Sequence, residues 1–286
     1  MTTGTRGNLA FGLAMVLSGT IGFVARGAGL EALPLVFARC LVGAMCLGTY
    51  VFLMRVRVGL SDLKAEAPWT VLSGLALVFN WVFLFRSFLT VPITVAVSLY
   101  YIAPVLVCLH GFFQSNERGP VLGWLGVAAA FLGTLLVSGL GNFQNLSSKH
   151  LLGCLFALVA AVLYATVMVL GRKIQRTPPA VLSLAQTLVG VAVLPIFLIG
   201  HVPSLEAVSW LRVSCLGAVH TGVMYILFFY GLRRSTTNAI AVLSFLDPLV
   251  AVGIDSIVFQ RLLGASEWAG VALIFCGVVA AKVGGR

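Results

Sequence analysis

Long runs of apolar residues follow one another along the chain, separated by short polar stretches. Ten runs can be counted, near residues 8–25, 33–53, 69–87, 92–113, 120–140, 151–171, 180–200, 210–230, 238–259 and 266–283. A helix needs about 20 apolar residues to cross the hydrocarbon core of a bilayer, whereas a barrel strand needs only about 9–11. The runs match the helical length and lack the alternation of barrel strands. The pattern therefore predicts an all-α integral membrane protein with ten transmembrane helices.

Composition agrees with a membrane protein and excludes two other classes. Apolar residues make up 60% of the 286 residues, and charged residues make up 9%. Soluble domains carry about 25% charged residues, and disordered chains are poor in apolar residues, so neither class fits. The net charge of +10 would favour nucleic acid as a partner in a soluble protein. Here the cations lie in short stretches beside apolar runs, so we expect the lipid bilayer, and no nucleic acid, as a partner.

The distribution of lysine and arginine predicts how the helices are oriented, because cytoplasmic loops carry an excess of these residues. With the N terminus inside, twelve of the eighteen lie on the cytoplasmic side: Arg6, Arg55, Arg57, Lys64, Arg118, Arg172, Lys173, Arg176, Arg233, Arg234, Lys282 and Arg286. Five lie on the opposite side: Arg26, Arg86, Lys149, Arg212 and Arg261. We therefore expect both termini in the cytoplasm and a multi-pass protein of the inner (plasma) membrane.

The two halves of the chain resemble each other. A shift of 144 residues aligns 85–137 with 229–281 without a gap, and shifts of 146 and 147 align the earlier helices. The long alignment pairs Pro104 with Pro248, Trp124 with Trp268, and Gly133 with Gly277. We predict two repeats, 1–145 and 146–286, of five helices each. Because five is odd, the second repeat enters the membrane from the opposite side. Such inverted repeats are typical of secondary transporters, whose substrate site lies near the membrane midplane between the repeats.

Three stretches resemble a known family. They are Leu99–Val105 (LYYIAPV), with Glu117, Gly126 and Gly133 after it; Phe79–Trp81 (FNW); and Leu243–Pro248 (LSFLDP), with Gly270 and Gly277 after it. In their order along the chain, with Phe79–Trp81 first, these stretches resemble an EamA-type ten-helix transporter of the drug/metabolite transporter superfamily. The resemblance implies a secondary transporter of the inner membrane, commonly an exporter of amino acids or other small metabolites. One position departs from the pattern, because Arg261 stands where the family often has a second glutamate equivalent to Glu117.

Ionisable residues inside apolar runs are costly and are candidates for function, and three of them are singled out here. Arg39, the eighteenth cation, can hold a substrate carboxylate through its guanidinium, or it can be structurally paired. Asp247 precedes Pro248 and is the candidate coupling residue: its carboxylate can bind a proton or cation, or accept bonds from backbone amides freed by the proline. His220 can relay protons near neutral pH, or can be satisfied by a neighbouring carbonyl. We predict substrate contacts for Arg39 and His220.

Aromatic residues are organised by the repeat. Trp81 aligns with Tyr225, Tyr101 with Phe245, and Tyr164 with Ser18. An apolar cavity with a few polar groups is the usual small-molecule site. We therefore expect substrate contacts from four aromatic residues and two polar ones: Trp81, Tyr101, Tyr164, Tyr225, Asn80 and Ser244. Helix packing, the interfacial aromatic belt and interhelical hydrogen bonding are the alternative roles for these residues.

Motifs for other chemistries are absent from the sequence. No GxGxxG or Walker pattern precedes a helix, and the six cysteines form no CxxC or Cys/His cluster. We expect no cofactor, no metal and no catalytic residues, because an intramembrane enzyme would need paired acids, a Ser/His pair or a metal cluster. The pattern favours a secondary transporter that exports small metabolites, amino acids above all, by alternating access. A lipid-carrier or lipid translocase of the same architecture is the alternative, and proton coupling and a monomeric or dimeric state stay open.

Overall fold

The computed structural model describes residues 3–26, 28–91, 93–115, 121–137, 148–198, 207–258 and 264–284. Every regular element among them is a helix. In chain order these are α1 (Thr3–Gly19), α2 (Ile21–Arg26), α3 (Ala32–Leu53), α4 (Leu60–Ser87), α5 (Ile93–Tyr100), α6 (Ile102–Ser115), α7 (Val121–Val137), α8 (Ser148–Lys173), α9 (Pro179–Val193), η1 (Leu194–Phe197), α10 (Ala207–Gly217), η2 (Ala218–Val223), α11 (Met224–Leu232), α12 (Thr237–Ser244), α13 (Leu246–Val258) and α14 (Ala265–Gly284). The expectation of an all-helical chain is confirmed for these residues. Glu117 and Arg261, the pair at which the chain departs from the family pattern, lie outside them.

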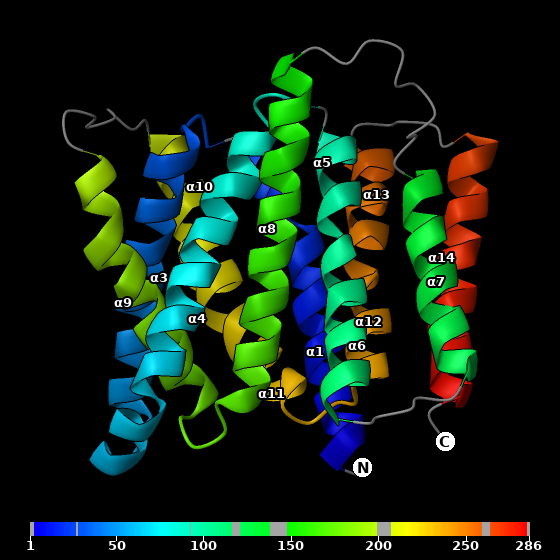
Figure 1. Ribbon diagram of the computed structural model, residues 1–286. Coiled ribbons are helices and arrows are strands. Elements are labelled where there is room, and N and C mark those ends of the chain that lie inside the picture. The colour runs from blue at the N-terminus through cyan, green and yellow to red at the C-terminus, as the bar shows by residue number, and fades with distance from the viewer. Residues whose placement is uncertain are drawn as a thin grey trace.

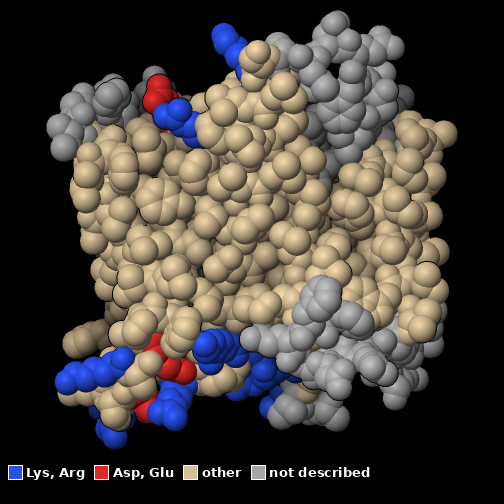
Figure 2. All heavy atoms as spheres, viewed as in Figure 1, with Lys and Arg blue, Asp and Glu red and all other residues tan. Residues whose placement is uncertain are grey.

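The described helices have the lengths and the surface of a multi-pass membrane protein. Seven helical segments are long and apolar enough to cross a bilayer, and three shorter apolar helices accompany them, at Ile102–Gly111, Trp124–Leu136 and Trp268–Gly277. Figure 2 shows the charged side chains gathered at the two ends of the visible face, with uncharged side chains covering the band between them. The number of ten spans stays a prediction. In Figure 1, α1 begins and α14 ends at the same end of the bundle, called the terminal end below.

Two helices are interrupted where the sequence places a proline. The interruption between α5 and α6 falls at Tyr101, and the one between α12 and α13 falls at Phe245. Proline has no N–H, so the carbonyl four residues earlier loses its helical donor. For Pro104 and Pro248 these carbonyls belong to Tyr100 and Ser244, the last residues of α5 and α12. Both helices therefore end where the missing hydrogen bond requires it, near the middle of the bundle.

Glycines let several helices approach at backbone distance. The helices α7 and α14 pack along each other at one edge of the bundle (Figure 1). A Cβ at Gly133 would lie 2.6 Å from the carbonyl oxygen of Gly270, and a Cβ at Gly277 would lie 2.5 Å from that of Gly126. The same kind of contact joins α1 to α11. There, a Cβ at Gly231 would lie 2.5 Å from the backbone nitrogen of Phe11.

Replacing Gly231 with alanine is expected to destabilise the protein, because the new methyl group has no space between α1 and α11. Overpacking costs about 1–3 kcal/mol, which exceeds the roughly 1 kcal/mol that alanine gains over glycine in a helix. The midpoint of thermal unfolding in detergent should therefore fall. Gly253→Ala in α13 is the matched control, since a Cβ there meets nothing within 4 Å, and its midpoint should stay or rise. An unchanged midpoint for Gly231→Ala would show that α1 and α11 are not in backbone contact.

Candidate binding site

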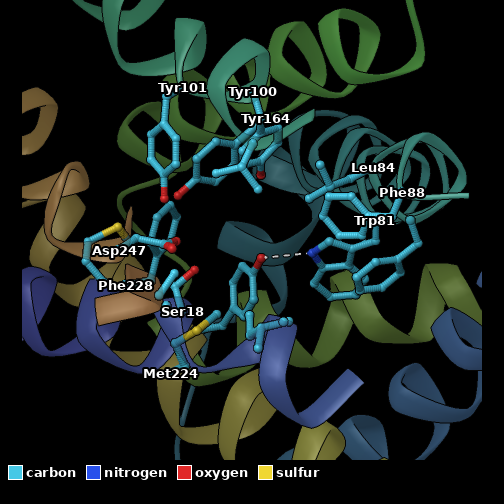
Figure 3. Close-up of a pocket in the computed structure, with 18 of the residues that line it drawn as sticks. Ser18, Trp81, Leu84, Phe88, Tyr100, Tyr101, Tyr164, Met224, Phe228 and Asp247 are labelled. Atoms are coloured by element: carbon cyan, nitrogen blue, oxygen red, sulfur yellow. Dashed lines mark hydrogen bonds between the residues drawn. The ribbon is translucent and has the colours of Figure 1, made fainter. Parts of the chain in front are cut away.

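A cavity of about 130 Å³ lies where helices from both predicted repeats meet. Its walls come from α1, α2, α3, α4 and α5 of the first repeat and from α8, α11 and α13 of the second. Eight of its nineteen lining residues are aromatic: Trp81, Phe85, Phe88, Tyr100, Tyr101, Tyr164, Tyr225 and Phe228. Figure 3 shows the labelled rings among them converging on the cavity from several helices. A concave space with aromatic walls and a few polar groups is the usual form of a small-molecule site.

Arg39 contributes a buried positive charge to the cavity wall. Its side chain is fully buried, and its guanidinium carbon lies 3.8 Å from the centroid of the Trp81 ring. Its Nε donates to Thr221 Oγ1 at 3.0 Å, and its Nη2 donates to the His220 carbonyl at 3.4 Å. Among the described residues no carboxylate lies within 4.0 Å of Arg39. Removing a charge from water costs several kcal/mol, and here no acid offsets that cost.

The partners of Arg39 belong to a single turn of π-helix, η2. The Thr221 hydroxyl donates its one proton to the Leu216 carbonyl at 2.9 Å, so a lone pair of the oxygen faces Arg39. Close contact between α3 and η2 is possible because Gly43, one turn after Arg39, has no side chain: a Cβ there would lie 2.7 Å from Thr221 Cγ2. Turns of π-helix occur frequently at functional sites. In this protein the turn holds the guanidinium against the Trp81 ring.

Two aromatic pairs that the repeat aligns are also in contact. Trp81 Nε1 donates to the Tyr225 hydroxyl at 3.2 Å, and their ring centroids are 5.5 Å apart. The rings of Tyr101 and Phe245 lie 5.9 Å apart. Each pair joins one residue of the first predicted repeat to its aligned residue in the second. Three of these four residues, Trp81, Tyr101 and Tyr225, line the cavity, and Phe245 packs behind Tyr101.

Tyrosines cover another wall of the cavity. Tyr164 stacks on Tyr100, with ring centroids 5.1 Å apart, and its other neighbour is Phe228 at 6.1 Å. The Tyr100 hydroxyl donates to Asn80 Oδ1 at 3.3 Å, and Asn80 Nδ2 donates to the Ala160 carbonyl at 2.6 Å. Asn80 does not line the cavity, but its two hydrogen bonds fix the position of Tyr100 relative to α8.

Asp247 brings a carboxylate to the cavity on the side opposite Trp81 (Figure 3). It lies in the first turn of α13, where the partial positive charge of a helix N-terminus favours an anion. The hydroxyl groups of Ser18 and Tyr101 are its hydrogen-bonding neighbours. Since Arg39 stacks on Trp81, the cavity carries a cation near one wall and an anion at another, with aromatic rings between them.

Six of the nine residues proposed from the sequence line this cavity: Arg39, Trp81, Tyr101, Tyr164, Tyr225 and Asp247. The other three are buried but do not line it. Asn80 makes the bonds just described. His220 Nε2 lies 2.7 Å from Thr20 Oγ1 and its Nδ1 lies 3.3 Å from the Cys215 carbonyl, while Ser244 donates to the Ile240 carbonyl at 2.8 Å. These contacts are of the kind expected from the alternative, structural roles.

Tyr100 and Thr221 were not singled out from the sequence. In the structure Tyr100 ends α5 and Tyr101 occupies the interruption before α6, and both line the cavity. Pro104, three residues after Tyr101, is the signal in the sequence for this interruption. Thr221 depends on the π-turn, for which Gly217 just before the turn and Gly222 within it offer only a weak indication.

No metal or cofactor site emerges from the part of the chain that the structure describes. Within it, no group of three or more His, Cys, Asp or Glu side chains could hold a metal ion. Cys40, Cys46, Cys154, Cys215 and Cys276 are free thiols. The described lining of the cavity offers a ligand the cation of Arg39, the anion of Asp247, hydroxyl groups and aromatic faces.

Comparison with known proteins supports a role in transport. The EamA-like transporter family matches the chain twice, over residues 5–139 and 151–281. An uncharacterized transporter YxxF of Bacillus subtilis (strain 168) is 35% identical over 268 residues, covering 93% of this chain and 86% of its own. An aromatic amino acid exporter, YddG of Ancylobacter novellus, is 28% identical over 200 residues, covering 68% of each chain. A solved crystal structure superposes with a TM-score of 0.85 at 20% identity over 97% of this chain and 98% of the other, which shows a shared fold. The chain belongs to the EamA-like transporter family.

Proposed function

We propose that the protein is a secondary transporter that exports amino acids or closely related small metabolites across the inner membrane. The observation that carries the proposal is Arg39, a buried cation with no carboxylate partner among the described residues, at a cavity whose opposite side holds Asp247. A guanidinium matches a carboxylate with two parallel hydrogen bonds, and a carboxylate attracts an ammonium group. A zwitterion placed between Arg39 and Asp247 would satisfy both charges.

The size and walls of the cavity favour a small substrate over a lipid. A volume of about 130 Å³ is close to that of an engineered apolar cavity of roughly 150 Å³ that accepts benzene. The rings of Tyr164, Phe228 and Phe85 offer apolar faces to the substrate side chain. A long lipid tail would need a much larger, laterally open space. The name of the Ancylobacter relative agrees with an amino-acid substrate.

Alternating access between two inverted five-helix repeats, within ten transmembrane helices, is the mechanism that we propose. Two separate family matches, one in each predicted repeat, support it. So do the contacts between aligned residues, such as Trp81 with Tyr225. α1 begins and α14 ends at the same end of the bundle, as both termini in the cytoplasm would require, and most visible Lys and Arg lie at that end (Figures 1 and 2). The relatives are named as transporters, which agrees with the expectation that the protein is not an enzyme.

Counterflow into proteoliposomes with radiolabelled amino acids, organic cations and sugars tests the proposal. Wild type is expected to accumulate amino acids. Trp81→Ala should lower the initial rate at least about tenfold, a loss equivalent to roughly 1.4 kcal/mol, because Arg39 and Tyr225 both lose their support. Trp268→Ala is the matched control, since its side chain is 61% exposed on the outside of the bundle, and it should transport normally.

The result that would contradict the proposal is equally specific. If folded wild-type protein accumulates none of the three classes, the metabolite assignment is wrong. Scrambling of fluorescent lipids by the same vesicles would then establish the lipid translocase. If Trp81→Ala and Trp268→Ala transport equally well, the cavity is not the substrate site.

A further inference from the structure

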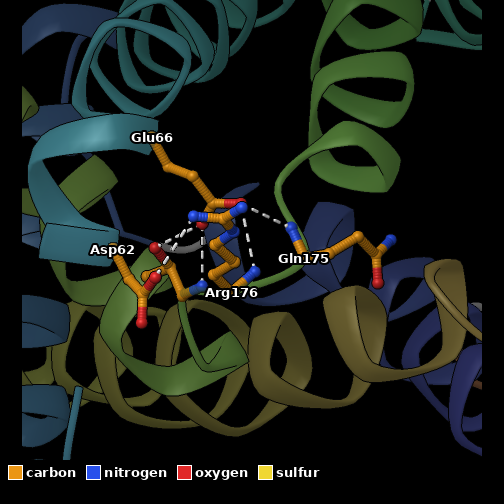
Figure 4. Close-up of polar contacts among 5 residues, drawn as sticks. Asp62, Glu66, Gln175 and Arg176 are labelled. Carbon is orange, nitrogen blue, oxygen red and sulfur yellow. Dashed lines mark hydrogen bonds and ion pairs between the residues drawn. The ribbon is translucent and has the colours of Figure 1, made fainter. Parts of the chain in front are cut away.

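The loop between α8 and α9 is bound by one buried carboxylate from another part of the chain. Glu66, in the second turn of α4, is 9% exposed. Its Oε1 accepts the backbone N–H groups of Gln175 at 2.9 Å and Arg176 at 3.0 Å, and its Oε2 accepts the N–H and hydroxyl of Thr177 at 2.8 and 2.7 Å (Figure 4). Four donors thus converge on one ionised group, and hydrogen bonds to charged groups are about twice as strong as neutral ones.

The sequence of the loop explains why the carboxylate is needed. Residues 178 and 179 are both proline and have no N–H to offer, so the last free donors before α9 are those of residues 175–177. Buried N–H groups without a partner are costly, and Thr177 is fully buried. Without Glu66 these three amides would have to reach water, which requires the loop to move away from α4.

A cation fixes the same loop from its other side. Arg233, directly after α11, donates to the carbonyls of Thr177 at 2.6 Å and Gly171 at 3.3 Å. Burial lowers the pKa of Arg233 to about 10, and the nearby Glu66 carboxylate opposes that shift, so the side chain stays charged at neutral pH. Glu66, residues 174–177 and Arg233 together form what we call the Glu66 clamp. An outer ion pair, Arg176 with Asp62 at 3.4 Å, is 65% and 39% exposed and contributes little.

The clamp lies far from the cavity, so its position suits control of access to the cavity and not contact with the substrate. Glu66 precedes Trp81 by fifteen residues of α4, or about 22 Å at 1.5 Å per residue. The clamp lies at the terminal end of the bundle, whereas the cavity is lined by the far ends of α1 and α4 and by α2. Because α4 belongs to the first predicted repeat and the loop to the second, the clamp ties the repeats together at one end.

No acid stands at the positions that the repeat aligns with Glu66. The shifts of 144 to 147 residues that align the repeats place Glu66 against positions 210–213, which hold Trp, Leu, Arg and Val. We infer that the Glu66 clamp is a one-sided lock: it holds the terminal end closed while the cavity faces the other end, and it must open whenever the cavity turns to the terminal end.

A cavity reporter tests the lock without any substrate. Ala251→Cys, on the cavity wall, is placed in a background with the six native cysteines replaced by alanine. A membrane-impermeant maleimide is added to right-side-out and inside-out vesicles, with a C-terminal tag marking the terminal end. Labelling from the terminal end should be slow with the clamp intact and about tenfold faster in Glu66→Gln. In this variant the amide NH2 replaces a carboxylate oxygen and cannot accept hydrogen bonds from the N–H and hydroxyl of Thr177. Asp62→Asn should leave labelling unchanged.

Hydrogen exchange in the same samples separates a lock from a local loop contact. A lock and a local loop contact both predict faster exchange of the 175–177 amides in Glu66→Gln. Unchanged labelling from the terminal end, with exchange accelerated, would overturn the lock. If Glu66→Gln does not fold, Thr177→Val is the second variant, because it removes only the hydroxyl donor. Labelling from the terminal end should then be faster than in wild type, by a smaller factor. Unchanged labelling in Thr177→Val would also overturn the lock. Absence of amino-acid transport would contradict the proposed function and leave these readouts valid.

Discussion

Replacing Arg39 with methionine should abolish amino-acid counterflow and leave the protein as stable as before, or more stable. Loss of the bidentate carboxylate contact is expected to lower the rate at least about 100-fold, roughly 2.8 kcal/mol. Stability should not fall, because Arg39 has no carboxylate partner within 4.0 Å among the described residues. Methionine of similar length fills the site without a desolvated charge, and such replacements of buried ions are often neutral or stabilising.

This combination of effects separates a substrate contact from a structural arginine. The bonds that Arg39 makes are to Thr221, whose proton is already donated to Leu216, and to the His220 carbonyl. Neither group becomes an uncompensated charge when the guanidinium is removed. A large fall in the thermal midpoint of Arg39→Met would therefore show that Arg39 is needed for folding. Normal counterflow in Arg39→Met would show that Arg39 does not bind the substrate.

Two further variants make the Arg39 test more specific. Arg39→Lys keeps the charge but loses the planar fork and the stacking on Trp81, so the rate should still fall at least about tenfold. Competition by the substrate's decarboxylated amine, which is 3-methylbutylamine in the case of leucine, should be equal in wild type and Arg39→Met. Thr221→Val removes the hydroxyl that accepts from Arg39 Nε and should raise KM for the amino acid. Thr221→Ser keeps a hydroxyl there and should have the KM of wild type.

The features that could be predicted from the sequence are those that depend on local pattern. Apolar runs predicted the helices, and the missing N–H of Pro104 and Pro248 is the local signal in the sequence for the two interruptions. The alignment of Trp81 with Tyr225 and of Tyr101 with Phe245 anticipated which aromatic residues would stand together, because repeat-related positions meet near the boundary between the repeats.

Features that depend on tertiary contacts could not be predicted in this way. Nothing in the sequence around His220 shows that its carbonyl turns towards Arg39, since that geometry arises from the π-turn. In the sequence, Glu66 resembles an ordinary acid near the interfacial end of a helix. Its four bonds to a loop more than a hundred residues away become visible only in three dimensions.

Asp247→Asn is the second large effect that we expect, and it addresses how export is driven. The Asp247 carboxylate can hold either a proton or the substrate's ammonium group, but not both at once. We predict that such a site exchanges one for the other, which would couple the proposed export to proton entry. In wild-type proteoliposomes an imposed pH gradient should therefore drive uphill accumulation of the amino acid. In Asp247→Asn the gradient should no longer drive it, because the amide cannot take up the proton.

Competition by substrate analogues should separate the two charges of the site. The deamino analogue of the substrate, which is 4-methylpentanoate in the case of leucine, lacks the ammonium group and should compete equally well in wild type and Asp247→Asn. The intact amino acid should bind Asp247→Asn at least about tenfold more weakly, since one charge-assisted contact is lost. Asp62→Asn is the matched control, because it removes a carboxylate that is 39% exposed at the terminal end. Unchanged flux, affinity and pH profile in Asp247→Asn would exclude this carboxylate as the coupling group, and the protein would then act as a facilitator or exchanger whose selectivity rests on Arg39.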